Sequence, residues 1–544
     1  MNKQSLIKGA TVLAAAGIVV KILGAVFRLP LVNWIGETGM ANYGPAYYIY
    51  AFLVILATSG LPVAISKMVS ESIAVGNYYQ AHRVFTLSSR LMFGMGLTFF
   101  LILFIFAPQI AALMSNPDSA PAMRMIAPSL LLVPIMAAYR GYFQGMQNMK
   151  PTAVSQIVEQ FFRVVIGLGA AYILFFVVGD GVFGGYDKYA GGAAGANLGA
   201  TAGSLGGLLM ILFIYMLARK GILSKVRRTA SMGSDSNGRI MRDILVIAVP
   251  ITIGAAIMPI SNLIDSALVM NRLTDGAGFS QEMAKELYGQ LSGFVGSLIN
   301  FPQLLTQAVA VSIVPIIAAA YQTKNRENLN NNVSLGIRMS VIIGFPCAFG
   351  LMVLAEPILL LLYPNQVESA SNAASILMIN AFGVLFLSTT QTVTGILQGV
   401  GKQMVPVKNL LIGMVVKILL TWILVGMPSI NVNGAAIGTV VSYIIAVTLN
   451  LRAVKKYTGT KLDAGLIFVK PFIASALMGA VVFGAYKLFM GITGHNSIAT
   501  LLGVGVGVVV YVIMIFVTKA IKKEELAMLP KGDKIVRIVG KFVK

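Results

Sequence analysis

The sequence predicts an all-α polytopic membrane protein with about fourteen transmembrane helices. We expect two six-helix lobes in parallel pseudo-two-fold repeat, followed by two extra C-terminal helices. Of the 544 residues, 57% are hydrophobic and only 11% are charged, and the mean hydropathy is +0.83; soluble globular proteins do not have this balance. Apolar segments of bilayer-spanning length recur along the whole chain, and short motifs of the first half recur in the second.

Each apolar segment is long enough to be a spanning helix, because a lipid-exposed segment must satisfy its own backbone hydrogen bonds. In chain order the segments are 9–31, 42–66, 85–108, 122–144, 152–178, 194–218, 243–270, 287–320, 334–362, 371–399, 406–427, 433–451, 468–489 and 498–518. Segment 287–320 is overlong and contains Pro302 and Pro315, so we expect it to tilt or break. Lys3 and Lys8 before an alanine run resemble a signal peptide, but the apolar stretch between them and the alanines is short, so we expect a retained first helix.

The distribution of lysine and arginine predicts the orientation of the helices. Of the 41 basic residues, 28 lie in or beside the N-terminus, the loops after even-numbered segments and the C-terminal tail, and four lie in or beside the other loops. Basic residues favour the cytoplasmic side, so we expect both termini in the cytoplasm of a cell whose plasma membrane holds the chain. The net charge of +22 therefore indicates contact with anionic membrane lipids and not with nucleic acid.

An internal repeat predicts the lobes. Gln144-Gly145 ends the fourth segment and Gln398-Gly399 ends the tenth, each followed by a short basic loop and a proline, and at the same offset Arg163 falls on Lys417. Six helices return the chain to its starting side, so the two copies run parallel, with an expected cavity between them and alternating access by rocking. The predicted divisions are a lobe at 1–218, a basic, flexible cytoplasmic linker at 219–243, a lobe at 244–455, two additional helices at 456–520 and a basic cytoplasmic tail at 521–544.

Charges inside the segments are the candidate functional residues, since a charge near the bilayer centre costs at least about 2.5 kcal/mol. Lys21 and Arg28 are seven residues apart, which places them on nearly the same face of the first helix. They indicate a site for an anionic ligand; the alternative is that both side chains snorkel to the interfaces. Arg163 is deep as well, but Glu159 lies one turn before it, so an internal ion pair is an alternative there.

Short motifs spread over the whole chain resemble one family. They are Lys21-Ile22-Leu23-Gly24 through Arg28, Gly36-Glu37-Thr38-Gly39-Met40-Ala41, Leu61-Pro62, Asn262-Leu263-Ile264-Asp265-Ser266 and Asn300-Phe301-Pro302. With the helix count and order, they resemble the multidrug/oligosaccharidyl-lipid/polysaccharide (MOP) flippase superfamily. The branch that the chain resembles most is that of the lipid II flippases (MurJ-type) and their Gram-positive polysaccharide-export and sporulation relatives.

The resemblance implies a flippase, not an enzyme, that moves an undecaprenyl-pyrophosphate-linked saccharide, foremost the peptidoglycan precursor lipid II, to the outer leaflet. It implies that Lys21 and Arg28 receive the pyrophosphate. A cavity arginine of the family falls on Ser297 here, and an acidic residue after Gly-Met-Ala is replaced by Asn42 or Tyr43. Further positive charge is therefore expected from Arg90, Arg163 or Lys417. Cell-wall synthesis proteins are the partners that the resemblance implies.

Other functions fit the sequence less well. A flippase for another lipid-linked polysaccharide stays open, whereas an ion-coupled exporter of organic cations would need buried carboxylates, and the deep ones are Glu159 and Asp265. A membrane enzyme would need a carboxylate or histidine cluster, and none is evident; a non-transporting scaffold would not explain cations inside spanning helices. With no ATP-binding motif, no cysteine pair beside Cys347 and only two histidines, we expect no cofactor, metal or disulfide. Transport would then draw on membrane potential or a sodium or proton gradient, with Asp265 as the candidate for an ion or hinge contact.

Overall fold

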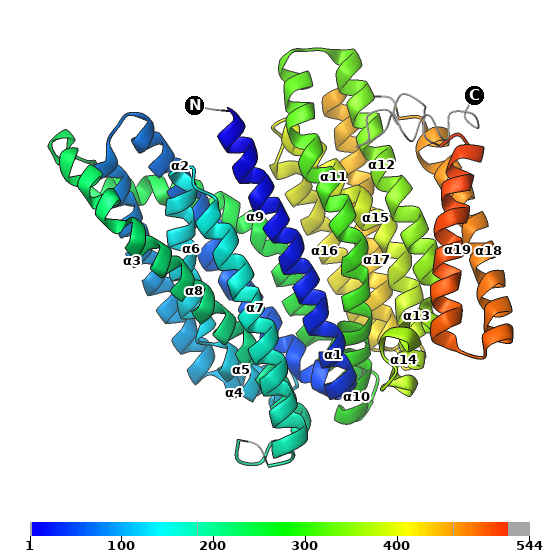
Figure 1. The fold of residues 1–544 in the computed structure, drawn as a ribbon. Coiled ribbons are helices and arrows are strands. Elements are labelled where there is room, and N and C mark those ends of the chain that lie inside the picture. Colours follow the sequence, from blue (N-terminus) through cyan, green and yellow to red (C-terminus); the bar gives the residue numbers. More distant parts are fainter. Residues whose placement is uncertain (1–2, 182, 461, 521–544) are drawn as a thin grey trace. The chain divides into compact units, whose positions relative to one another are not determined.

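The computed structural model describes residues 3–181, 183–460 and 462–520, so the predicted tail at 521–544 lies outside the described residues. Nearly all of the described chain is helical, and Figure 1 shows the helices in sequence colours. Twelve described stretches are long and apolar enough to cross a membrane. The chain is therefore an all-α, multi-pass membrane protein, as the sequence predicts. It divides into two compact units, residues 1–274 with 280–289, and residues 275–279 with 290–544.

Unit 1 is built around α1 (Lys3–Thr58), which packs on α7, α8, α9 and α10. Its further helices are α2 (Leu61–Ala74), α3 (Tyr78–Ile105), α4 (Ala107–Leu113), α5 (Ala120–Ile126), α6 (Ser129–Gly145), α7 (Lys150–Tyr172), α8 (Lys188–Arg228), α9 (Asn237–Asn271) and α10 (Gln281–Gly289), with short turns η1 (Pro117–Ser119), η2 (Ile173–Val178) and η3 (Ala230–Met232) between them. The helix pair α7 and α8 packs closely along glycines, as spanning helices do where small residues let backbones approach.

A kink divides α1 into two arms. At Gly36 the backbone has φ 60° and ψ −163°, a conformation that residues with a Cβ rarely adopt. Gly289 of α10 packs against this kink so closely that an added Cβ would lie 2.0 Å from the Glu37 carbonyl oxygen. The predicted segments 9–31 and 42–66 are thus two helices joined directly at Gly36, and α2 continues the second; with α2 they count once, as the stretch Val19–Ala74, among the twelve.

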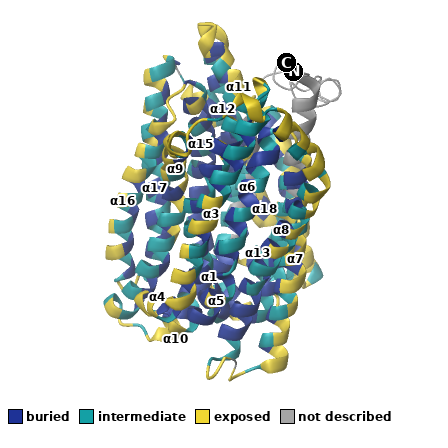
Figure 2. Ribbon diagram, turned by 90° about the vertical axis from the view of Figure 1, so that its left-hand side faces the viewer, coloured by how far each residue is buried: buried dark blue, intermediate teal, exposed yellow. Residues whose placement is uncertain are grey.

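Unit 2 contains the remaining helices. They are α11 (Gly296–Gln322), α12 (Arg326–Val353), α13 (Ala355–Leu362), α14 (Val367–Asn372), α15 (Ala374–Gly399), α16 (Met404–Val425), α17 (Asn433–Thr458), α18 (Lys470–Thr493) and α19 (Asn496–Val517), with turns η5 (Gln290–Val295) and η6 (Gly465–Val469). Its main core lies between α11, α12, α15 and α17. The hairpin of α18 and α19 packs on α12 and α13. In Figure 2, buried and exposed residues alternate along the helices, as expected where one face meets protein and the other lipid.

Two regions differ in detail from the expectation from sequence. In segment 287–320 the helix passes through η5, a π-helical turn, before α11 begins at Gly296, and Pro302 and Pro315 both lie inside α11. Residues 219–243 hold the last turns of α8, η3 and the start of α9, and the loop between these helices bonds to the first turns of α3: Arg83 bonds to Ser234 and Asn237. These contacts, which the local sequence does not reveal, order the polar run. Helix α9 packs on α1 and α2, so unit 1 extends beyond the predicted lobe boundary at 218.

Candidate functional site

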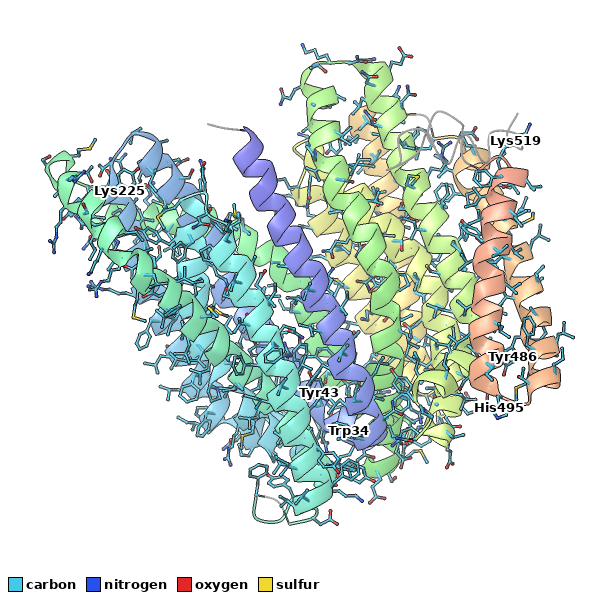
Figure 3. The ribbon with its side chains drawn as sticks, in the orientation of Figure 1. Trp34, Tyr43, Lys225, Tyr486, His495 and Lys519 are labelled. Atoms are coloured by element: carbon cyan, nitrogen blue, oxygen red, sulfur yellow. The ribbon has the colours of Figure 1, made fainter. Side chains whose placement is uncertain are left out.

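A row of tyrosines follows the kink in α1. Tyr43, Tyr47 and Tyr50 are spaced by four and three residues, which places them on one helix face. The rings of Tyr43 and Tyr47 stack with centroids 5.8 Å apart and 12° between their planes, and the Tyr50 ring lies 6.0 Å from that of Tyr47. Tyr43 and Tyr50 are buried. Figure 3 labels Tyr43 near Trp34, whose ring packs on Tyr172 of α7.

Arg163 of α7 meets this row. Its guanidinium carbon lies 5.1 Å from the centroid of the Tyr47 ring, and its charge is within electrostatic range of Tyr43, Tyr47 and Tyr50. The alternative that Arg163 pairs with Glu159 is not what the structure records. Glu159 accepts a hydrogen bond and a salt bridge from Arg140 of α6, with 2.9 Å between Nη2 and Oε2. Arg140 thus takes the nearby carboxylate, and Arg163 is directed toward the tyrosines.

Arg28 and Asp265 approach the same tyrosines from two other directions. Arg28, half-buried on the first arm of α1, is within electrostatic range of Tyr43, Tyr48 and Tyr288. Asp265 of α9 is within range of Tyr48 and Tyr288. These residues come together because α7, α9 and α10 all pack on α1. The seven residues of unit 1 form what we name the cation–tyrosine cluster: Arg28, Tyr43, Tyr47, Tyr48, Arg163, Asp265 and Tyr288.

The other predicted cations lie elsewhere. Lys21 is exposed on α1, about 10 Å along the helix from Arg28 at 1.5 Å per residue. Arg90 is exposed on α3, where it lines a depression together with Tyr139 of α6. Lys417 belongs to unit 2 and is 8% exposed on α16, beside α17. The structure therefore brings Arg28, Arg163 and Asp265 to one place, and Lys21, Arg90 and Lys417 to three others.

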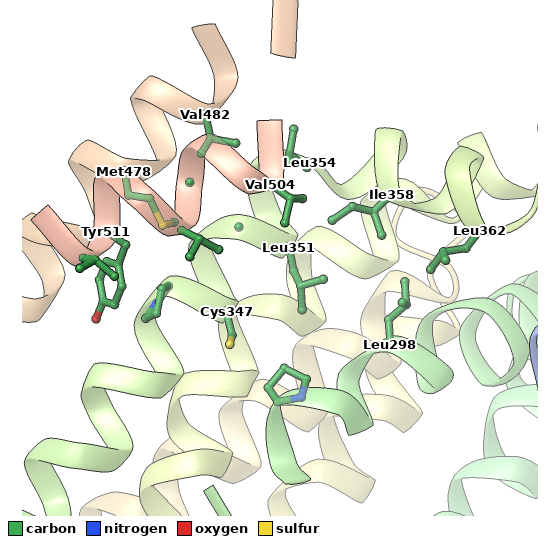
Figure 4. A pocket seen from close by; sticks show the side chains of 16 residues that line it. Leu298, Cys347, Leu351, Leu354, Ile358, Leu362, Met478, Val482, Val504 and Tyr511 are labelled. Carbon is green, nitrogen blue, oxygen red and sulfur yellow. The ribbon is translucent and has the colours of Figure 1, made fainter. Parts of the chain in front are cut away.

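Unit 2 contains an apolar cavity of about 770 Å³ between α11, α12, α13, α18 and α19. Its walls include Leu298, Leu351, Met478 and Val504, shown in Figure 4. Tyr511 lines it as well and donates a hydrogen bond from its hydroxyl to the Ile342 carbonyl at 2.6 Å. That carbonyl lacks its usual helical partner because Pro346, four residues on, has no N–H. This bond ties the α18–α19 hairpin to a proline position of α12.

The cation–tyrosine cluster can hold an anion that carries hydroxyl groups. Guanidinium groups bind phosphate oxygens in a bidentate manner, and tyrosines offer hydroxyls and flat rings. Among the described residues, no three His, Cys, Asp or Glu side chains gather as a metal site requires.

Charge inside apolar segments predicts the cations of the cluster but not its tyrosines. The run Tyr43, Tyr47, Tyr48 and Tyr50 is nevertheless a readable signal, because its spacing gathers hydroxyls on neighbouring faces of one helix. The apolar cavity has no comparable signal, since its walls come from helices up to 214 residues apart in sequence.

Comparisons with known proteins agree with this architecture. The family model described as polysaccharide biosynthesis protein matches residues 6–321, and the MatE model matches residues 292–423. Stage V sporulation protein B of Bacillus subtilis (strain 168) is 28% identical over 551 residues, covering 100% of both chains. Lipid II flippase MurJ of the same organism is 28% identical over 503 residues, covering 90% of this chain and 89% of the relative.

Solved structures share the fold. The inward closed conformation of a lipid II flippase MurJ has a TM-score of 0.63 at 15% identity and covers 93% of this chain and 98% of its own. An inward-facing multidrug resistance MATE family transporter of the MOP superfamily has a TM-score of 0.68 at 14% identity and covers 81% of this chain and 94% of its own.

Proposed function

This chain belongs to the polysaccharide biosynthesis protein family of the MOP flippase superfamily, and from that premise we propose that it moves a lipid-linked saccharide across the membrane. The substrate that we propose is an undecaprenyl-pyrophosphate-linked saccharide, foremost lipid II, carried from the inner to the outer leaflet by alternating access. The single observation that carries this proposal is the cation–tyrosine cluster, which suits a pyrophosphate followed by a sugar. Several relatives are named flippases and a structural neighbour is named a transporter, which supports translocation and not catalysis.

Each element of the cluster has a part in the proposal. Arg28 and Arg163 hold the pyrophosphate, because two guanidinium groups can share its roughly two negative charges. Tyr47 and Tyr43 position Arg163 and offer rings and hydroxyls to the first sugar. Lys21, exposed farther along α1, lowers the cost of moving the headgroup toward or away from the cluster. Lys417, the repeat counterpart of Arg163, is proposed to do the same in unit 2.

The apolar cavity of unit 2 supports a lipid substrate. A polyprenyl chain is wholly apolar, and burying it in a wall of leucine, valine, methionine and proline side chains replaces contact with acyl chains at little cost. We propose that this cavity receives part of the chain while the headgroup crosses. An exporter of small organic cations would have less use for it.

A second candidate is a flippase for a different lipid-linked saccharide. Stage V sporulation protein B matches the chain over its whole length at the same identity as the MurJ relative. A probable low-salt glycan biosynthesis flippase, Agl15 of Haloferax volcanii, is 25% identical over 210 residues, or 38% of this chain and 42% of its own. All of these substrates would share a phosphate-linked saccharide, so the cluster serves this candidate as well.

Orientation and energy source are further parts of the proposal. The loop charges support cytoplasmic termini, and membrane potential acts on a moving charge with about 2.3 kcal/mol per elementary charge per 100 mV. Asp265 is proposed as the coupling residue, since it lies in the cluster on α9, between the prolines of that helix and α10. Asp265→Asn should leave substrate binding intact while abolishing the response of transport to an imposed sodium, proton or potential gradient; an unchanged response would exclude this role.

Purified protein in proteoliposomes tests the function directly. Fluorescent lipid II, a second undecaprenyl-pyrophosphate-linked saccharide and an organic cation would be supplied in turn, and the transported fraction measured with a membrane-impermeant quencher. We expect both saccharide lipids or one of them to move, and the cation not to. Movement of the cation alone would contradict the proposal.

A further inference from the structure

A second basic site lies on the outer surface of unit 1, apart from the cation–tyrosine cluster. Arg90 of α3 is exposed and lines a depression of about 310 Å³ with Phe85, Thr86, Ser89, Phe93 and Tyr139. We propose that this depression, named here the Arg90 site, binds the phosphate group of a membrane lipid. The inference does not rest on the proposed transport function.

The position of Arg90 along α3 places it inside the hydrocarbon layer. The far end of α3 is a run of exposed apolar side chains that includes Leu101, Phe104 and Ile105. The core of a bilayer is about 30 Å thick, or about 20 helical residues, so counting back from Ile105 puts the other boundary near Thr86. Arg83 bonds to the polar loop at Ser234, beyond that boundary. Arg90 therefore lies about one turn inside, close enough for its head to reach the interface.

An arginine whose head reaches the interface is attracted there by anionic lipid headgroups. Within the described part of the chain, Arg90 has no hydrogen bond or ion pair, unlike Arg140, which is bonded to Glu159 at 2.9 Å. No carboxylate lines the depression. An anion that pairs with Arg90 would therefore come from outside the described part of the protein, and at the headgroup level that anion is a lipid phosphate.

The neighbours of Arg90 suit a phosphate. Thr86 and Ser89 line the depression without serving as donors to it, because the Thr86 hydroxyl donates to the His82 carbonyl at 2.9 Å and the Ser89 oxygen is buried. The Tyr139 ring is fixed edge-on against Phe85 and Tyr215, with centroids 5.0 Å apart in each pair. The Tyr139 hydroxyl is therefore a donor carried on a rigid ring at the wall of the depression.

A second arginine adds positive charge near Tyr139. Arg219, exposed near the end of α8, is within electrostatic range of both the Tyr139 and Tyr215 side chains. Phe93, also exposed, gives the attached acyl or prenyl chain an apolar wall on the lipid side. The Arg90 guanidinium, the Tyr139 hydroxyl and an apolar flank, with the charge of Arg219 nearby, suit a phosphate on a lipid chain.

Native mass spectrometry of the purified chain tests the Arg90 site. Dioleoyl phosphatidylglycerol is titrated onto wild-type protein, Arg90→Ala, Arg90→Lys and Arg452→Ala, the last being a matched control with an exposed arginine on α17 of unit 2. Loss of one charged phosphate contact should weaken the tightest phosphatidylglycerol binding about tenfold in Arg90→Ala. Arg90→Lys should weaken it less, and Arg452→Ala should match wild type. Equal affinity in Arg90→Ala and Arg452→Ala would overturn the proposal.

Two further arms complete the test. If Arg90→Ala does not fold, Arg219→Ala and Tyr139→Phe replace it, and wild-type affinity in both would equally overturn the site. Undecaprenyl phosphate is then added as a competitor. Displacement of phosphatidylglycerol would show that a substrate-type lipid reaches the Arg90 site, and no displacement would assign the site to phospholipid; either result supports a lipid-phosphate site and identifies its source.

Discussion

Replacement of Arg163 by glutamine separates headgroup binding from mere packing. The guanidinium lies 5.1 Å from the Tyr47 ring centroid and within electrostatic range of Tyr43 and Tyr50. A cation–π contact of this kind contributes about 0.5–2 kcal/mol. The cost of desolvating the guanidinium offsets part of this contribution. We therefore expect Arg163→Gln to lower the free energy of unfolding by no more than about 2 kcal/mol.

The effect on transport should be larger than the effect on folding. Removing one charged contact to the pyrophosphate costs about 1.5–3 kcal/mol, which corresponds to roughly 10- to 150-fold weaker binding. Arg163→Lys keeps the charge but loses the planar geometry, so we expect partial transport. Tyr47→Phe keeps the ring and removes only the hydroxyl, and should retain most transport. The assay is flipping in proteoliposomes at matched protein density, with lipid titration to obtain the apparent affinity. Full flipping by Arg163→Gln at wild-type affinity would refute the reasoning.

Three other predictions follow from the same structure. Single cysteines are introduced at the exposed positions Ser231, Lys455 and His495 of a protein in which Cys347 is replaced by serine. The first two should react with a membrane-impermeant thiol reagent only from the cytoplasmic side, and the third only from outside. The reverse labelling in intact cells would exclude the proposed orientation. Lys21→Ala should reduce flipping with no change in thermal stability, whereas Lys21→Arg should retain flipping, because an exposed cation acts on the headgroup by its charge. Normal flipping by Lys21→Ala at equal abundance would indicate that Lys21 is a snorkelling anchor. Tyr511→Phe should destabilise the protein by about 1–3 kcal/mol, because it leaves the Ile342 carbonyl without its donor. In a thermal-shift assay this loss should be smaller in a Pro346→Ala background, because the new backbone N–H can bond to the same carbonyl. Equal losses in both backgrounds would disprove the coupling between Tyr511 and Pro346.

The helices could be predicted from the sequence because each spanning segment is decided locally, by about 20 apolar residues. Segments 243–270 and 406–427 correspond to α9 and α16 within a few residues. The direct join of the first two predicted segments at Gly36, without a loop between them, could not be predicted, because it depends on a glycine conformation and on Gly289 packing against it. The order in residues 229–236 likewise comes from contacts with α3, about 150 positions away.

The candidate site was predictable only in part. A charge in an apolar segment is visible in the sequence, so Arg28, Arg163 and Asp265 can be recognised from the sequence alone. Their convergence depends on α7 and α9 packing on α1, which the sequence does not encode locally. The pairing of Glu159 with Arg140 instead of Arg163 has the same cause, since it is decided by the approach of α6. Its charge inside an apolar segment predicts that Arg90 belongs to the same site as Arg28 and Arg163, whereas the structure places Arg90 on α3, beside Tyr139.

Transport by wild-type protein and by the double variant Arg28→Gln/Arg163→Gln, compared in proteoliposomes, decides whether the cation–tyrosine cluster carries the headgroup. The quantity measured is the initial rate at which fluorescent undecaprenyl-pyrophosphate-linked disaccharide becomes accessible on the opposite leaflet, at matched protein density. We predict translocation by wild-type protein and a rate at the protein-free background for the double variant. Equal rates for the two proteins, with both correctly folded, would contradict a headgroup site at this cluster.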